Sequence, residues 1–397
     1  MNGSDGRGGR AAAVSRPAVA WVFALNGLSF SCLVARLPDV RGNLDLSNGD
    51  LGLLLLTISL GSLAALSASG VFVGRYGPTA VVRVGSGFAL TGLVLAGVGV
   101  GAASSVVLTA AGFAIYGIGI SSWDVAMNVE AAEVERALDR TIMPRFHAAW
   151  SLGTFGGAGI GVLLTRADVP VLLHLAVGGV IACGATAGAA GLFLPRSADV
   201  ARAGEDVAGP GRSRSPWTEP RTLAIGVMVL CFAAGEGAAN DWLTLALIDG
   251  YDAPHWVGVA GFALFVSAMT LGRLTGPVAL DRWGRVPVLA VLAVVSGAGV
   301  LLVVAGVSGP AAGLGIVLWG SGVALGFPVG MSAAADDAAG SARRVSVVAT
   351  IGYGAFLTGP PLLGALGDAV GTLDSLLAVA ALMGVAVLTV GAARKPA

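Results

Sequence analysis

The stretch Tyr116-Gly-Ile-Gly-Ile-Ser-Ser-Trp-Asp-Val-Ala-Met-Asn128 places a single carboxylate, Asp124, inside an apolar run. Such runs make up most of the chain, because 55% of its 397 residues are hydrophobic and only 12% are charged. A soluble globular domain carries about 25% charged residues, so the composition predicts an integral membrane protein. An acid at the centre of a membrane helix costs roughly 2.5 to 3.5 kcal/mol and usually serves a pathway, which favours a transport function.

The apolar runs are long enough for helices that cross a bilayer. A hydrocarbon core of about 30 Å needs about 20 helical residues, and continuous apolar runs without two-residue alternation exclude a membrane β-barrel. Twelve runs meet this length: Ala18–Arg36, Leu51–Val73, Thr79–Gly101, Ser105–Met127, Ala148–Thr165, Val169–Leu194, Thr222–Ile248, Trp256–Leu280, Val286–Val307, Pro310–Met331, Val345–Leu366 and Leu373–Ala393. The sequence predicts an all-α integral membrane protein with twelve transmembrane helices.

The distribution of arginine predicts the orientation. With the N-terminus in the cytoplasm, only Arg36, Arg41 and Arg166 fall in outer loops, which follows the positive-inside rule. Both termini are therefore expected in the cytoplasm, and the membrane is expected to be the plasma or inner membrane. The polar segment between the sixth and seventh runs predicts a linker. The expected parts are a cytoplasmic tail (1–17), an N-terminal six-helix bundle (18–194), a cytoplasmic linker (195–221), a C-terminal six-helix bundle (222–393) and a cytoplasmic tail (394–397).

The two halves of the chain are similar to each other. A shift of 203 residues aligns Glu133 with Asp336 and Trp150 with Tyr353. Two similar six-span halves around a polar linker resemble the layout of major facilitator superfamily (MFS) transporters, which implies a solute site near the bilayer midplane and alternating access between the halves.

The loop after the eighth span adds to this resemblance. It reads Asp281-Arg282-Trp-Gly-Arg285, which resembles the Gly-x-x-x-Asp-Arg-x-Gly-Arg signature of the superfamily. An acid, arginines and a glycine-permitted tight turn predict a charge lock that forms in one state and breaks in another. The matching first-half loop keeps Arg75 but has Gly74 in place of the acid. The alternative is that these residues only set topology and turn geometry.

Two membrane helices carry an acid and an amide on one face. Asp124 and Asn128 are four residues apart on the fourth span, and Glu236 and Asn240 repeat this spacing on the seventh. Residues four apart lie one above the other on a helix. We therefore expect both pairs to bind solute or exchange protons.

Each acid also has a structural alternative. Asp124 could pair with a loop arginine such as Arg140 or Arg145, and Glu236 could pair with Arg36 near the outer end of the first span. An arginine beside a carboxylate favours its ionised form, and the acid would then be one half of a structural ion pair.

A further resemblance concerns the fourth and fifth spans. Trp123-Asp-Val-Ala-Met-Asn128, followed by His147-Ala-Ala-Trp150-Ser-Leu-Gly153, resembles the corresponding segment of fucose-permease-like transporters, and especially the MosC-like branch associated with rhizopine metabolism. The resemblance implies proton-coupled transport of a small sugar-like or polyol-like solute, with the fourth-helix acid handling protons or solute. The fucose permease also has an acid in its first helix. This chain has none there and offers Asn26 instead, so coupling by the same pair of acids is not implied.

The candidate solute contacts are thus Asn26, Trp123 and Trp150 in addition to the two acid and amide pairs. The expected partners are a small-molecule substrate, protons and the lipid bilayer, with no nucleic acid, and the chain is expected to be a monomer. No cofactor, metal site or enzymatic motif is expected, since the sequence has no paired nucleophile and base and no metal-ligand spacing. The alternatives are a proton-driven exporter of small organic molecules and a membrane sensor or scaffold that does not transport.

Overall fold

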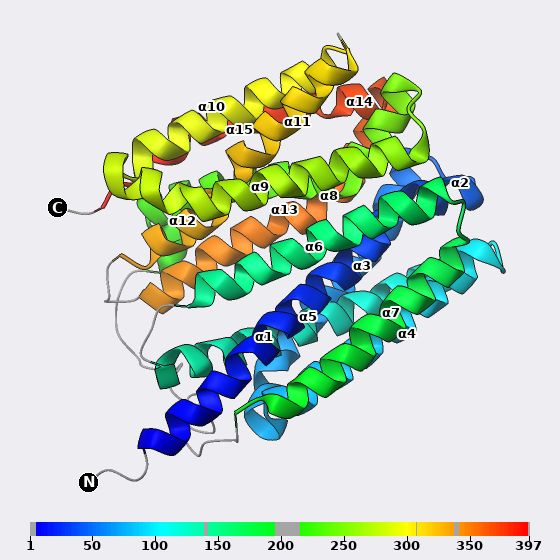
Figure 1. Cartoon of the computed structure of the whole chain (residues 1–397). Coiled ribbons are helices and arrows are strands. Elements are labelled where there is room, and N and C mark those ends of the chain that lie inside the picture. The colour runs from blue at the N-terminus through cyan, green and yellow to red at the C-terminus, as the bar shows by residue number, and fades with distance from the viewer. Residues whose placement is uncertain (1–4, 139–141, 195–214, 307, 337–340, 396–397) are drawn as a thin grey trace. The chain divides into compact units, whose positions relative to one another are not determined.

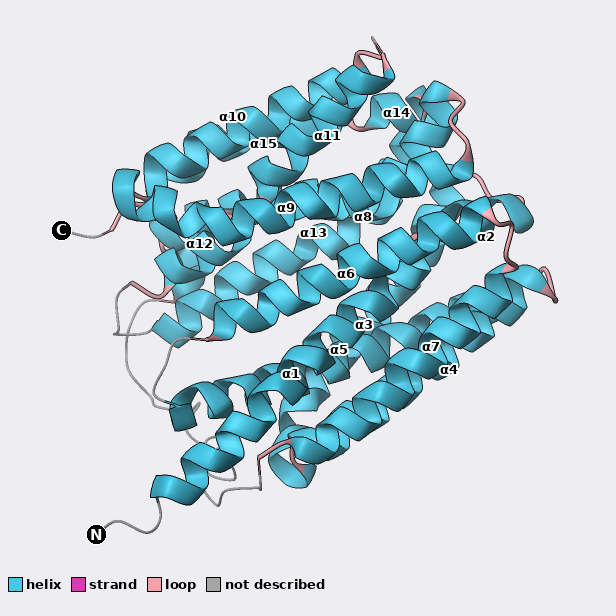
Figure 2. Cartoon of the chain, in the orientation of Figure 1, coloured by secondary structure: helices cyan, strands magenta, loops and turns pink. Residues whose placement is uncertain are grey.

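The computed structural model describes residues 5–138, 142–194, 215–306, 308–336 and 341–395. Within these ranges every regular element is a helix, and Figure 2 shows no strand. Twelve helical segments are long and apolar enough to cross a membrane. Helices satisfy all their backbone hydrogen bonds internally, which is what a lipid environment requires. The prediction of an all-α protein with twelve membrane helices is confirmed.

Contacts within the chain divide it into two compact units. Unit 1 comprises Met1–Asp45 and Thr57–Pro210, and unit 2 comprises Leu46–Leu56 and Gly211–Ala397. The first two turns of the third helix therefore group with unit 2, whereas the rest of that helix belongs to unit 1. Each unit is described by itself below.

The helices α1, α4, α5, α6 and α7 of unit 1 form one connected set. Helix α4 packs against α5 and α7, and α1 packs against α5, α6 and α7. Small residues permit this packing, because a Cβ at Gly112 would lie 2.8 Å from the carbonyl oxygen of Gly92. In chain order the elements are α1 (Asp5–Val34), α2 (Leu37–Asn43), α3 (Asn48–Tyr76), α4 (Pro78–Gly101), α5 (Val106–Leu138), α6 (Met143–Arg166), α7 (Val171–Ala189) and η1 (Ala190–Leu192), as Figure 1 shows.

Helix α8 is the central element of unit 2, where it packs against α13, α15, α9 and α12. Its Trp242 side chain is fully buried. The elements of this unit are η2 (Pro216–Thr218), α8 (Pro220–Tyr251), α9 (His255–Trp283), α10 (Arg285–Val304), α11 (Gly309–Val323), α12 (Gly326–Ala334), α13 (Ser341–Val370), α14 (Thr372–Ser375), α15 (Leu377–Thr389) and η3 (Val390–Ala393).

The tenth predicted span differs from the prediction of one continuous helix. It is divided between α11 and α12, with a turn at Ala324 and Leu325. Pro328 lies four residues after Ala324 and has no N–H, so the Ala324 carbonyl loses its usual partner within the helix. This freed carbonyl becomes part of the polar cluster described below.

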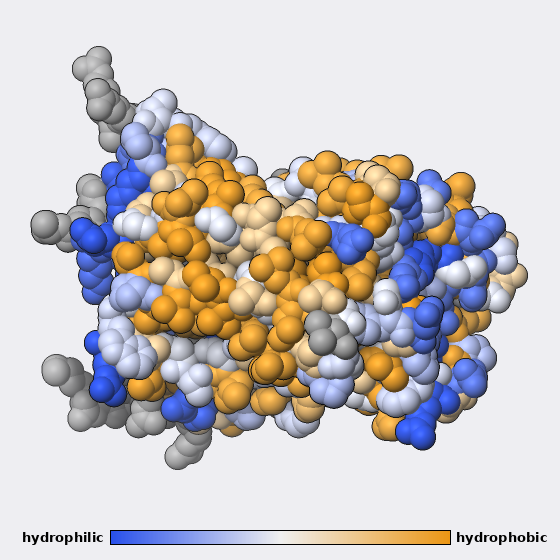
Figure 3. Space-filling model, turned by 90° about the horizontal axis from the view of Figure 1, so that it is seen from above, coloured by the Kyte–Doolittle hydropathy of each residue, from blue (hydrophilic) through white to orange (hydrophobic). Residues whose placement is uncertain are grey.

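Apolar side chains also cover much of the outer surface. Figure 3 shows orange residues over a large part of the visible face. Among the exposed side chains, Val107 on α5 is 80% exposed and Leu388 on α15 is 84% exposed. A soluble protein rarely leaves this much apolar surface uncovered, whereas a bilayer would cover it.

Candidate functional site

The acid and the amide of the fourth span contact each other, as their spacing predicted. The Nδ2 of Asn128 donates to the backbone oxygen of Asp124 at 2.9 Å and to its Oδ1 at 3.3 Å. Both side chains are half-buried on α5. In the described part of the chain Asp124 has no arginine partner, and Arg140 lies outside the described residues. Asp124 is thus a carboxyl group within a membrane segment whose hydrogen bond comes from a neutral amide.

Asn26 and Trp150 meet between α1 and α6. The indole Nε1 of Trp150 donates to Oδ1 of Asn26 at 2.9 Å, and Nδ2 of Asn26 lies 3.5 Å from the carbonyl oxygen of Ile120. Asn26 is only 2% exposed, so these contacts replace water at a buried amide. The structure therefore brings together two residues that the sequence suggested only as separate candidates.

Glycines explain why these two helices approach closely enough for the contact. A Cβ at Gly27 or at Gly153 would overlap backbone oxygens of the opposite helix, that of Trp150 and that of Ala24 respectively. Only glycine permits such an approach between membrane helices. Gly156, one turn further along α6, faces open space and has no such role.

Trp123 lies elsewhere. It is 1% exposed, and its Nε1 has no hydrogen-bond partner. Its backbone packs against α4, where a Cβ at Gly85 would lie 2.8 Å from the Trp123 nitrogen. A side chain this deeply buried is inaccessible to a solute in the described conformation, so its position favours a packing role.

The acid of the seventh span has a charged partner. Nη2 of Arg273, on α9, lies 3.1 Å from Oε1 and 3.0 Å from Oε2 of Glu236. The side chains are 26% and 14% exposed. The pair is therefore partly shielded from solvent, where a charged hydrogen bond is stronger than at an open surface. Asn240, one turn beyond Glu236, is half-buried.

The suggested pairing of Glu236 with Arg36 is wrong. Arg36 is occupied in unit 1, where its Nε donates to Nδ1 of His174 at 2.8 Å and its Nη2 donates to the carbonyl of Val169 at 2.8 Å. Arg36 also pairs with Asp39 at 3.2 Å. Arg36 therefore satisfies its donors locally, because Asp39 is only three residues away and Arg36 lies close to the end of its own helix.

Arg273 is a residue that the sequence analysis missed. Besides holding Glu236, its Nε donates to the freed Ala324 carbonyl at 3.3 Å. It thus connects α8, α9 and the break between α11 and α12. The available signal was a lone arginine inside the predicted span Trp256–Leu280, since a charge within a membrane helix is a functional candidate by default.

The predicted gating residues lie at the ends of their helices. The guanidinium of Arg75 is 5.5 Å from the centre of the Tyr76 ring, and that of Arg282 is 5.3 Å from the centre of the Trp283 ring. Asp281 is exposed. Both arginines therefore stack on neighbouring aromatic rings, which stabilises an exposed guanidinium.

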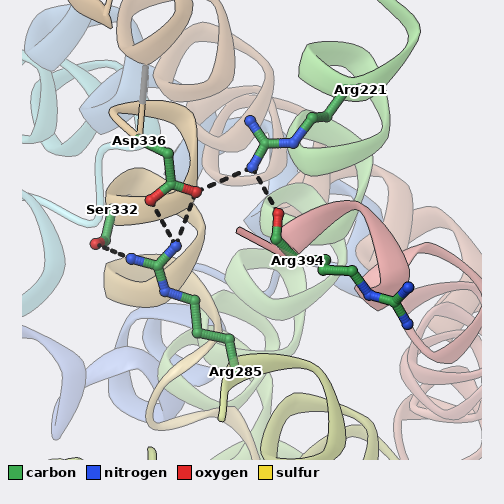
Figure 4. Close-up of polar contacts among 5 residues, drawn as sticks. All are labelled: Arg221, Arg285, Ser332, Asp336 and Arg394. Carbon is green, nitrogen blue, oxygen red and sulfur yellow. Dashed lines mark hydrogen bonds and ion pairs between the residues drawn. The ribbon is translucent and has the colours of Figure 1, made fainter. Parts of the chain in front are cut away.

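Arg285, one of the predicted gating residues, pairs with an acid other than Asp281. Nη1 of Arg285 donates to Oδ1 and Oδ2 of Asp336 at 2.8 and 2.9 Å, and Figure 4 shows this carboxylate between Arg285 and Arg221. Arg221 contacts Oδ2 of Asp336 at 3.0 Å and the carbonyl of Arg394 at 2.9 Å. Asp336 follows α12 and lies about fifty residues along the chain from Arg285, so the acid that Arg285 contacts in this structure is not the one adjacent in sequence.

The glycine turns of both loops follow the prediction. Gly77 has φ +82° and ψ 160° before α4, and Gly284 has φ +80° and ψ 169° before α10. Glycine populates positive φ readily because it has no Cβ. The two loops therefore share one backbone conformation although only the second carries an acid.

Glu130 is a second residue that the sequence analysis missed. It is 1% exposed, and its Oε1 accepts from the Ser15 hydroxyl at 2.9 Å and from the Leu194 backbone nitrogen at 2.7 Å. It connects α1, α5 and the segment after η1. An acid near the end of an apolar run was a weak signal, because such positions are often simply solvated.

The family follows from a comparison over most of the chain. The model of the Major Facilitator Superfamily matches residues 19–360. The chain belongs to this superfamily. It is therefore a multi-pass membrane transporter and not an enzyme, as the sequence predicted. Among the described residues of this transporter, no group of three or more possible ligands could hold a metal ion.

Relatives and solved structures agree with the resemblance found in the sequence. "Uncharacterized transporter y4wD" of Sinorhizobium fredii (strain NBRC 101917 / NGR234) is 30% identical over 368 residues, covering 88% of this chain and 90% of that protein. "Membrane protein MosC" of Rhizobium meliloti is 27% identical over 371 residues, covering 92% and 86%. The fold matches the nucleoside transporter NupG with a TM-score of 0.74, 14% identity and 100% of each chain covered. It matches FucP in the outward conformation with a TM-score of 0.65, 15% identity and 96% and 98% covered.

Proposed function

We propose that this transporter is a proton-coupled importer of a small polar solute of the sugar or polyol class. It would act by alternating access in the plasma or inner membrane, with both termini in the cytoplasm. The observation that carries the proposal is the polar chemistry inside unit 1. There a neutral amide and indole pair, Asn26 and Trp150, and an acid bound only to an amide, Asp124 with Asn128, lie within membrane helices.

Neutral donors and acceptors suit a solute with several hydroxyl groups. The carboxamides of Asn26 and Asn128 each offer both kinds of atom, and the Trp150 ring offers an apolar face. No described positive charge neutralises Asp124. A proton neutralises a carboxyl without any partner residue, so Asp124 is the residue we assign to proton coupling.

One such acid suffices to drive accumulation. A proton that moves down about 150 mV releases about 3.5 kcal/mol, from about 2.3 kcal/mol per 100 mV. This free energy supports a concentration ratio of roughly 300-fold. A single proton per solute would therefore explain useful import.

The acid of unit 2 receives a different assignment. Glu236 is held by Arg273 at 3.0 Å, so its charge is already balanced. We assign Glu236 and Asn240 to hydrogen bonding of solute hydroxyls. Trp123 is left out of the assignment because it is 1% exposed.

The gating assignment also differs from the one that the sequence suggested. We propose that Arg285 with Asp336, at 2.8 Å, forms the lock that opens during the transport cycle. Asp281 and Arg282 would act at the exposed end of α9 in the same unit, and Arg75 would act at the exposed end of α3 in unit 1.

Uptake into proteoliposomes tests the proposal. The purified chain is reconstituted, a pH gradient is imposed with the interior alkaline, and uptake of radiolabelled L-fucose, myo-inositol and a nucleoside is measured. Fucose and nucleoside are included because two solved structures of the same fold are described as a fucose:proton symporter and a nucleoside transporter. We expect gradient-dependent accumulation of at least one of the hydroxyl-rich solutes.

Variants then connect the activity to the site. Asp124→Asn should abolish accumulation driven by the gradient, whereas Asp168→Asn, in an exposed loop of the same unit, should leave it unchanged. Accumulation that ignores the gradient would contradict proton coupling. Accumulation of solute in vesicles with an acidic interior, without uptake in the first arrangement, would instead support a proton-driven exporter, because protons that flow outward then exchange for solute that moves inward.

A further inference from the structure

One hollow of about 360 Å³ opens in unit 1 where α1 and α6 begin. Its size lies in the range of about 300 to 1,000 Å³ that ligand pockets occupy. Two of its lining residues are arginines, Arg16 and Arg145, and both side chains are exposed. The other lining residues are Ala13, Pro17, Ala20, Ile142 and Phe146.

The hollow results from the residues on the two facing helices. Ala13, Pro17 and Ala20 recur at helical spacing, so α1 presents a row of small side chains there. On the opposite wall, Phe146 is 2% exposed, and its ring stacks on that of Phe23 with 5.7 Å between centroids. The Phe146 ring is thereby held back, and the space between the helices stays open.

The corresponding position in unit 2 is neutralised within the chain. The 203-residue shift between the halves places Glu219 at the position of Arg16. Glu219, at the start of α8, accepts from Nε of Arg344 at 2.6 Å, and Arg344 lies in the first turn of α13 as Arg145 lies in that of α6. The same shift places Val348 at the position of Arg145, so the Arg16 position is the one that changes from an arginine to an acid between the halves. None of the residues that line the hollow is an acid, although Glu135 accepts from the backbone nitrogen of Ile142, which does line it.

Two like charges beside a hollow favour an anion. Arg guanidinium groups bind phosphate oxygens through fixed, paired donors. The arginine distribution predicts that this end of unit 1 faces the cytoplasm, where the membrane surface carries anionic lipids. Arg16 and Arg145 also lie at or near the first residues of the two candidate membrane segments, Ala11–Asn43 and Arg145–Arg166.

An exposed apolar side chain lies beyond the hollow on each helix. Trp21, one turn after Pro17, is 66% exposed, and Leu152, two turns after Arg145, is 59% exposed. Residues at these spacings share a helix face. A molecule with a phosphate at one end and an acyl chain at the other matches this arrangement better than a free anion does.

We propose that this hollow binds the phosphate headgroup of an anionic phospholipid through Arg16 and Arg145. The site is separate from the proposed solute site, and its occupancy would fasten the starts of α1 and α6 to each other.

Lipid binding to the full chain tests the proposal. Native mass spectrometry in detergent measures binding of phosphatidylglycerol and of phosphatidylcholine, and thermal unfolding is followed with each lipid and with inorganic phosphate. We expect selective binding of phosphatidylglycerol. The double variant Arg16→Ala/Arg145→Ala should lose roughly 30-fold in affinity, from about fivefold for each arginine near an anionic surface.

Two further variants separate the site from general surface charge. Arg136→Ala removes an exposed arginine of α5 outside the hollow and should keep wild-type affinity. Ala13→Leu keeps both arginines but fills the hollow, and should weaken binding as the double variant does. Wild-type affinity in Arg16→Ala/Arg145→Ala or in Ala13→Leu would overturn the proposal. Stabilisation by inorganic phosphate equal to that by phosphatidylglycerol would overturn the lipid assignment in favour of a soluble anion.

Discussion

Unit 1 and unit 2 hold their intramembrane polar groups in different ways. At the candidate site of unit 1 the contacts are between neutral groups or between an acid and an amide, as in Asn26 with Trp150 and Asp124 with Asn128. The ion pair of Arg36 with Asp39 lies apart from these residues, at the end of α1 and in α2. In unit 2 an acid is matched by a full positive charge, Glu236 with Arg273. A balanced pair is costly to separate, whereas an acid without a counter-charge is free to exchange a proton. The difference supports our proposal that proton coupling belongs to unit 1, and it gives unit 2 the charge pair.

The largest expected effect comes from breaking the charge pair. Arg273→Ala leaves Glu236 without its cation and the Ala324 carbonyl without a donor. We expect the free energy of unfolding, measured by denaturant titration in detergent, to fall by about 3 kcal/mol, the lower end for broken buried pairs.

A double variant provides the control for this prediction. In Arg273→Ala/Glu236→Gln no charge is left unpaired, so part of the lost stability should return. If the double variant is no more stable than Arg273→Ala, Glu236 is not the group that Arg273 compensates.

A smaller effect is expected from separating α1 and α6. Gly153→Ala places a Cβ against the backbone oxygen of Ala24. Overpacking of this kind costs about 1 to 3 kcal/mol, and we expect about 2 kcal/mol in the same denaturant titration. Gly156→Ala, three residues further on, meets open space and should be neutral or slightly stabilising, because alanine favours a helix. Equal destabilisation by both variants would contradict the assigned helix contact.

The hydrogen bond between Trp150 and Asn26 in unit 1 is expected to contribute less to the free energy of unfolding than the pair of Glu236 with Arg273 in unit 2. Trp150→Phe removes the indole donor and leaves Oδ1 of buried Asn26 unsatisfied. This should lower the free energy of unfolding by about 1 kcal/mol. Trp21→Phe, at a side chain that is 66% exposed, serves as the matched control and should change little. A loss as large as that of Arg273→Ala would remove the distinction between the two units.

The smallest effect concerns pH and the start of α8. The hydrogen bond from Arg344 holds the pKa of Glu219 below its ordinary value of 4.5. The stability that this pair contributes is therefore complete above pH 4.5 and is lost as the pH falls through the lower pKa of the folded protein. Below pH 4.5 the melting temperature of the wild type should fall slightly more steeply than that of Glu219→Gln. Parallel curves would show that the exposed pair contributes nothing measurable.

The twelve spans could be predicted from the sequence because each depends on its own residues. About 20 consecutive apolar residues are enough for a helix to cross the bilayer, whatever the rest of the fold is. The same local reasoning placed Asp124 above Asn128, since four residues make about one helical turn. It also identified Gly284 as a turn residue, because positive φ is a property of single residues.

The break in the tenth span shows where local reasoning was incomplete. Pro328 was a visible signal, because a proline removes the hydrogen bond to the carbonyl four residues earlier. Hydropathy alone joined the segment into one span. The consequence of the break, a carbonyl that Arg273 can reach, depends on which helix packs beside it.

The sequence by itself determined the class of protein, the number of membrane helices and the helix faces that carry polar groups, because these depend on composition and on the helical period. Only the tertiary structure decided the partners. Glu236 has Arg273 instead of Arg36, Arg285 has Asp336 instead of Asp281, and Asn26 meets Trp150 across 124 residues. Contacts between helices depend on where small residues permit close approach, and no repeat along a single helix specifies that distance.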